Sequence, residues 1–169
     1  VDRLEHFAAV AGERTFVARR NAGGDWLRIT YADMLERARR VGQALVQRGL
    51  SPDRPVAILS DNDLEHLTLS LGAMWVGVPF APISPAYSLV SQDHAKLRFI
   101  LGRLTPGLVF AASPAYGRAI ADAVAPTTEV VLTDGQLEGR PATPFAELLQ
   151  TQPGAASDAA HARVGADTI

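Results

Sequence analysis

A few polar side chains stand directly after runs that resemble buried strands, and these are the residues best placed to do chemistry. In an open α/β sheet, ligands bind beyond the carboxyl ends of the strands. The two strands concerned are the runs Val56–Leu59 and Val78–Ile83. Hydroxyl, amide and phenol groups after them can exchange hydrogen bonds with a small substrate. The candidate substrate contacts are Ser60, Asn62, Ser84 and Tyr87.

Each candidate also has a structural explanation, and the sequence leaves both open. Asn62, three residues before Glu65, has the spacing of a helix cap. Ser84 precedes Pro85, a pair typical of turns. Tyr87 can cover a core with its ring while its hydroxyl stays in water.

Complete catalytic and metal-binding motifs are missing from the sequence. The chain has no GxGxxG after a strand, no GxxxxGK[ST], no HExxH and no GxSxG. It has no cysteine, which excludes disulfides, thiolate ligands and cysteine nucleophiles. Lys96, the single lysine, is predicted on the exposed side of its helix. Four histidines lack a second ligand at metal spacing: His6, His66, His94 and His161. We predict no catalytic residue and no metal site in this chain.

The stretch between the two strands predicts a buried helix over Asp63–Val76. Its apolar face is expected from residues at spacings of three and four: Leu64, Leu67, Leu71, Met74 and Val78. Gly77 is placed to end the helix in a left-handed conformation. The uncharged run 67–92 is long enough to suggest a membrane span, but its prolines at 79, 82 and 85 lack N–H donors. We therefore expect no membrane span.

The rest of the chain alternates strand and helix patterns. Two extended runs around Asn21–Asp25 predict an N-terminal β-hairpin. Thr30 is expected to cap a helix that ends at Gly49, and Ser91 and Thr143 are expected to cap later helices. Further strands are expected at 107–111 and 129–132. This order predicts an α/β fold with a mostly parallel, doubly wound sheet.

Composition favours an ordinary globular protein. The 169 residues are 47% hydrophobic and carry a formal net charge of −2. We expect one α/β subdomain at 1–150, followed by a linker at 151–169. Without a basic excess, we expect no nucleic-acid or membrane partner, and the arginines at 37, 39, 40, 48 and 54 are expected on a solvated face. The absence of cysteine and of a signal peptide suggests the cytoplasm.

Two long segments resemble a known superfamily. Trp26–Leu45, WLRITYADMLERARRVGQAL, is similar to the ITYxEL segment that opens the large N-terminal domain of adenylate-forming enzymes, the superfamily of acyl-CoA synthetases, luciferases and peptide-synthetase adenylation domains. Arg54–Pro85 resembles the next segment, with its strand, buried helix ending in GA…G, and xPxxP run. The phrases SDNDLEH, GAMWVGVPFAPISPAYSLVSQDHAKLR and LTPGLVFA are most similar to feruloyl-CoA synthetases.

The resemblance implies an AMP-forming aryl-CoA ligase. In that reaction a carboxylic acid such as ferulate attacks the α-phosphate of ATP in the presence of Mg²⁺, and the thiol of CoA then displaces AMP. The family's phosphate-binding loop follows a segment like Gly165–Ile169, so this chain is expected to be an N-terminal fragment. We expect the fragment to be inactive, to bind no cofactor, and to self-associate through surface that the missing part would cover.

A stand-alone flavodoxin-like binding or signalling module is the alternative. Asp61 and Asp63 would then form an acidic site near a strand end. A phosphoacceptor site of this kind also needs a strand-end lysine, whereas Lys96 is predicted in mid-helix. Both acidic residues are also explained as favourable charges at a helix start.

Overall fold

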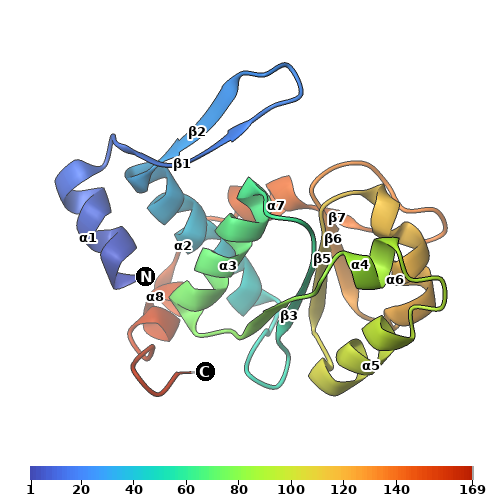
Figure 1. The fold of residues 1–169 in the computed structure, drawn as a ribbon. Helices are drawn as coiled ribbons and strands as arrows, with labels where there is room; N and C mark the ends of the chain where they lie inside the picture. The colour runs from blue at the N-terminus through green and yellow to red at the C-terminus, as the bar shows by residue number, and fades with distance from the viewer. Residues whose placement is uncertain (169) are drawn as a thin grey trace.

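A five-stranded parallel sheet lies at the centre of the computed structural model, which describes residues 1–168 (Figure 1). The strand order is β4-β3-β5-β6-β7. The strands are β3 Val56–Leu59, β4 Phe80–Pro82, β5 Leu108–Ala111, β6 Glu129–Leu132 and β7 Thr143–Pro144. Every residue of β3 and β5 is buried, as expected for central parallel strands without polar alternation. The predicted α/β fold with a mostly parallel sheet is confirmed.

Helices cover both faces of the sheet (Figure 1). The helices on one face are α2 Tyr31–Gln47, α3 Leu64–Val76, α7 Phe145–Gln150 and α8 Ala155–His161. The helices on the other face are α4 Ala86–Leu89, α5 Ala95–Leu104, the 3₁₀ turn η1 Pro114–Tyr116 and α6 Gly117–Ala123. Ile58 and Phe110 join the core under α2 and α3, whereas Leu59 and Val109 join the core under α5 and α6. Successive strand residues point to opposite faces, so one sheet supplies two cores. Among residues 1–168, no helix is both long and apolar enough to cross a bilayer.

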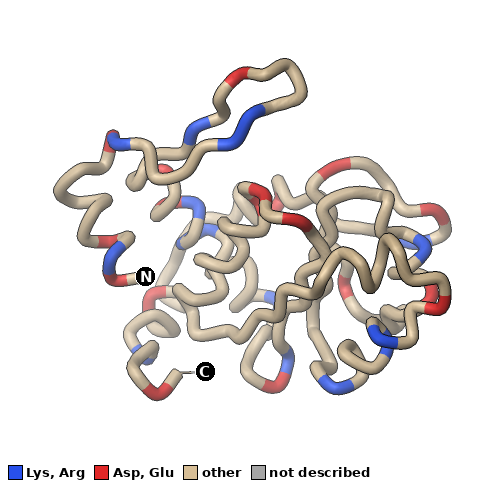
Figure 2. Tube along the Cα trace, in the orientation of Figure 1, with Lys and Arg blue, Asp and Glu red and all other residues tan. Residues whose placement is uncertain are grey.

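The N-terminal part adds a helix and the predicted hairpin. Helix α1, Asp2–Ala11, is followed by the antiparallel strands β1 Thr15–Arg20 and β2 Trp26–Thr30. A third apolar cluster joins them to α2 and α3: Leu4, Ile29, Met34, Ala38 and Leu64. The tip of the hairpin stands clear of the helices (Figure 1). Figure 2 shows basic residues on both strands of the projecting hairpin.

The predicted ends of the two long helices are partly confirmed. Oγ1 of Thr30 accepts a hydrogen bond from the N–H of Asp33 at 3.1 Å, and Gly77 closes α3 with φ of 70°. The cap predicted at Asn62 is wrong. The carboxylate of Asp63 caps α3 instead, because its extended backbone lets Oδ1 accept from the N–H of His66 at 2.6 Å.

Two further predicted caps also have other roles. Helix α5 begins only at Ala95, and Oγ of Ser91 accepts from the N–H of His94 in the preceding turn. Thr143 lies in β7, where its hydroxyl donates to Oε1 of Glu129 at 2.8 Å. Both hydroxyls therefore hold the segment that precedes a helix, and neither caps the helix itself.

The predicted buried face of α3 is wrong in part. Met74 is 45% exposed. Leu67 and Leu71 are only half-buried, and they pack against the third apolar cluster, beneath the hairpin. The residues of α3 that enter the core between the sheet and helices α2 and α3 are Leu69, Ala73, Trp75 and Val76. A helix that is apolar on nearly every side gives no periodic signal for the face that the sheet will cover.

The segment 151–169, which the sequence predicts as a linker, contains the short helix α8. The N–H of Ser157 donates to Oε1 of Gln43 at 3.1 Å, and Ser157 and Ala160 are buried. The imidazole of His161 stacks on the indole of Trp75, with 3.6 Å between ring centroids. Small buried residues, one hydrogen bond and one ring stack hold this helix. Such contacts leave no periodic pattern of apolar residues, so the sequence did not predict the helix. The domain boundary at residue 150 stays a prediction.

Candidate functional site

The two predicted polar stretches leave the sheet at the same edge. Strands β3 and β4 are neighbours and run parallel, and the N–H of Ile83 donates to the carbonyl oxygen of Ile58 at 2.9 Å. Ser60 follows β3, and Ser84 comes two residues after β4. The topology therefore brings the segments that follow β3 and β4, which carry all four candidate residues, to the carboxyl edge of the sheet.

Ser60 is buried, and its hydroxyl contacts the first turn of α3. Its Oγ lies 2.9 Å from Nδ1 of His66, and the carbonyl oxygen of Asp61 lies 3.2 Å from the same nitrogen. In one tautomer Nδ1 accepts from Ser60, and in the other it donates to Asp61. Both arrangements tie the loop after β3 to α3, so Ser60 stabilises the loop.

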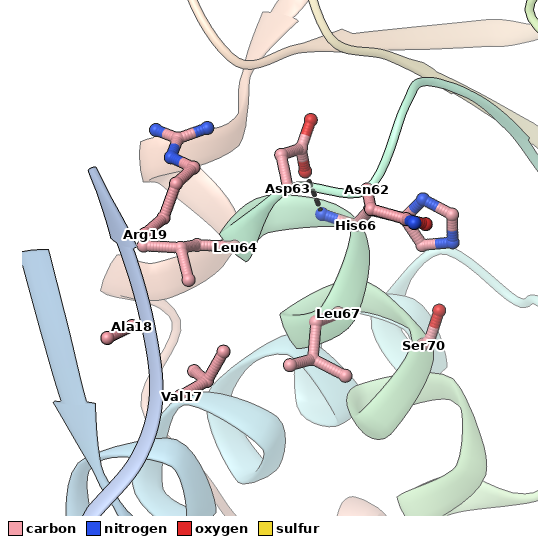
Figure 3. Close-up of a pocket in the computed structure, with 9 residues that line it drawn as sticks. All are labelled: Val17, Ala18, Arg19, Asn62, Asp63, Leu64, His66, Leu67 and Ser70. Atoms are coloured by element: carbon pink, nitrogen blue, oxygen red, sulfur yellow. Dashed lines mark hydrogen bonds between the residues drawn. The ribbon is translucent and has the colours of Figure 1, made fainter. Parts of the chain in front are cut away.

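Asn62 lies beside a cavity of about 400 Å³ between β1 and the start of α3 (Figure 3). Asn62, His66 and Ser70 supply its polar groups, and Arg19 lies at the side formed by β1. The hydroxyl of Ser70 is buried and has no hydrogen-bond partner among residues 1–168. Val17 and other apolar side chains complete the lining.

The charges around this cavity do not favour a phosphate. The carboxylate of Asp63 already occupies the N-terminus of α3, where an anion would otherwise bind. Nη1 of Arg19 lies 3.9 Å from Oε2 of Glu65, so this guanidinium also faces a carboxylate. The lining combines these few polar groups with apolar side chains such as Val17, Leu64 and Leu67. Among residues 1–168, no three His, Asp or Glu side chains gather to hold a metal.

Ser84 and Tyr87 lie apart from this cavity, although they share its edge of the sheet. Ser84 is exposed, and its carbonyl oxygen accepts from the N–H of Tyr87 at 3.0 Å. The ring of Tyr87 packs against the core under α5 and α6, and Nζ of Lys96 lies 5.8 Å from its centroid. Of the four predicted residues, Asn62 alone lines the cavity.

Tyr116 is a residue of this edge that the sequence interpretation missed. Burial raises the pKa of its phenol above the ordinary value of 10.0, and the carboxylates of Asp61 and Asp63 raise the pKa further. Tyr116 follows β5, the neighbour of β3, so the strand-end rule that selected Ser60 could also have selected it. Tyr116 is only 3% exposed and belongs to the core beneath the edge.

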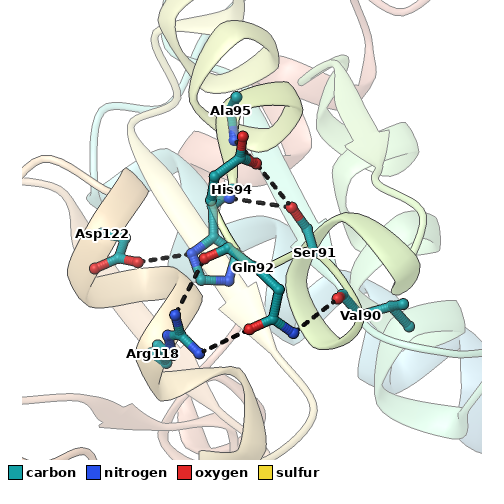
Figure 4. Close-up of polar contacts among 8 residues, drawn as sticks. Val90, Ser91, Gln92, His94, Ala95, Arg118 and Asp122 are labelled. Carbon is teal, nitrogen blue, oxygen red and sulfur yellow. Dashed lines mark hydrogen bonds and ion pairs between the residues drawn. The ribbon is translucent and has the colours of Figure 1, made fainter.

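A second polar cluster joins the start of α5 to α6 (Figure 4). Nδ1 of the buried His94 lies 2.7 Å from Oδ2 of Asp122. Nη2 of Arg118 donates to the carbonyl oxygen of Gln92 at 3.1 Å. The N–H of Ala95 and the hydroxyl of Ser91 lower the pKa of the Asp93 carboxyl. These contacts fix the turn before α5, so the cluster has a structural role.

The sequence matches the family of AMP-binding enzymes over residues 4–167. The chain belongs to this family. It is 31% identical over 84 residues to tyrocidine synthase 3 of Brevibacillus parabrevis, covering 46% of this chain and 1% of that protein. It is 33% identical over 60 residues to luciferin 4-monooxygenase of Photinus pyralis, covering 35% of this chain and 11% of that protein. The chain therefore spans a small part of these relatives.

Solved structures of other proteins share the fold of this chain. A benzoate CoA ligase from Burkholderia xenovorans LB400 aligns with a TM-score of 0.71 and 21% identity, covering 91% of this chain and 29% of that chain. A fatty acyl-adenylate ligase from L. pneumophila aligns with a TM-score of 0.63 and 18% identity, covering 91% and 25%. The parallel sheet with its N-terminal hairpin matches the N-terminal domain of adenylate-forming ligases. Family membership does not favour the flavodoxin-like alternative.

Proposed function

We propose that this chain is the N-terminal portion of an AMP-forming aryl-CoA ligase. The parent enzyme would convert a carboxylic acid such as ferulate, with ATP, Mg²⁺ and CoA, into acyl-CoA, AMP and pyrophosphate. The observation that carries this proposal is the family match over residues 4–167. The phrase GAMWVGVPFAPISPAY supports the feruloyl-CoA synthetase-like assignment. A cytoplasmic location is part of the same proposal.

The start of α3 and the single lysine do not fit the phosphates of ATP. The N-terminus of α3 is capped by Asp63, and the single lysine, Lys96, lies near the ring of Tyr87. A nucleotide site needs backbone N–H groups or cations that are free to face phosphate. The chain therefore contributes the sheet, its two cores and the edge loops, on which an active site built from other residues would rest.

The decisive experiment assays the complete protein that contains this chain. Purified enzyme is given ATP, Mg²⁺ and one acid at a time, and pyrophosphate release and CoA-thioester formation are measured. Ferulate is expected to support both, whereas benzoate and a long-chain fatty acid are expected to support much less. Equal or greater thioester formation with a fatty acid would refute the aryl assignment. Absence of acid-dependent pyrophosphate release with every acid would refute the ligase proposal.

The isolated chain gives a second test. Residues 1–169 alone are expected to release no pyrophosphate with ferulate and to show no saturable ATP binding in calorimetry. Ferulate-dependent pyrophosphate release would show that the nucleotide site lies within these residues. Acetyl-phosphate labelling of Asp61 or Asp63 would instead support the signalling alternative. Light scattering across a concentration series tests the predicted self-association.

A further inference from the structure

We draw no further inference here: the strongest candidate, the cavity between β1 and the start of α3 that is lined by the buried Ser70, whose hydroxyl has no hydrogen-bond partner among residues 1–168, carries none, because the chain covers only 29% and 25% of the two solved structures described above and nothing in the structure shows whether a ligand or the rest of the same protein fills this space.

Discussion

A β carbon added to Gly72 of α3 would lie 2.5 Å from Cγ1 of Val41 on α2. Real β carbons do not approach other atoms so closely. The backbone of α3 at Gly72 therefore packs directly against the Val41 side chain of α2. The carbonyl oxygen of Ala38 would lie 3.2 Å from the same added atom. This close approach lets α2 and α3 lie together on one face of the sheet.

We predict that Gly72→Ala destabilises the protein by about 1–3 kcal/mol, because the methyl group forces α2 and α3 apart. Gly102→Ala is the matched control in helix α5, where an added β carbon meets no atom of residues 1–168 within 4 Å. The control should be neutral or stabilising by about 0.5–1 kcal/mol. Urea unfolding of the complete protein measures both. Equal effects of the two substitutions would contradict the packing argument.

The cap of α3 can be tested by adjacent substitutions. Asp63→Ala should lower the free energy of unfolding by about 1 kcal/mol, because the N–H of His66 loses its acceptor. Asn62→Ala should change the free energy by less than about 0.5 kcal/mol, because Asn62 is exposed and does not cap. Thermal and urea unfolding distinguish them. A larger effect at Asn62 would restore the cap predicted from sequence.

Tyr116 should make stability fall at alkaline pH. The unfolded phenol ionises near pH 10, whereas the folded phenol keeps its proton to higher pH because its pKa is raised. Above pH 10 the folded state therefore binds more protons than the unfolded state, and the free energy of unfolding decreases until the folded pKa is passed. Below pH 10 this group causes no change.

The comparison with Tyr116→Phe isolates this effect from the other titrating groups. The variant should lose a smaller fraction of its stability than the native protein between pH 9 and pH 11, roughly around the ordinary pKa of tyrosine. Urea unfolding across that range supplies the data. Parallel pH profiles for the two proteins would show that Tyr116 does not titrate differently in the folded state.

The turn before α5 should depend on the contact between His94 and Asp122. Asp122→Ala removes the oxygen that lies 2.7 Å from Nδ1 of the buried imidazole. Because the Asp122 side chain is 43% exposed and water can replace it, we expect a loss of only about 1 kcal/mol. Asp134→Ala, at an exposed position in another loop, is the control. Hydrogen exchange at residues 91–95 should quicken only in the first variant.

The sequence by itself determined most of the elements and the fold class. Unbroken apolar runs predicted β3, β5 and β6, and Thr30 and Gly77 marked helix ends correctly. These features depend on residues close in the chain, such as a cap and the N–H three residues later. The shared edge of Ser60 and Ser84 also followed from the strand-end rule once β3 and β4 were neighbours.

Only the tertiary structure decided the contacts between distant segments. Asn62 and Asp63 are equally good caps in isolation, and the backbone angles of the folded loop select Asp63. Helix α3 is apolar on nearly every side, so its buried side is set by where α2 and the sheet lie. Helix α8 is held by Gln43 and Trp75, which lie far away in the chain. Local sequence patterns carry no record of such partners, because their energy exists only after the chain has folded.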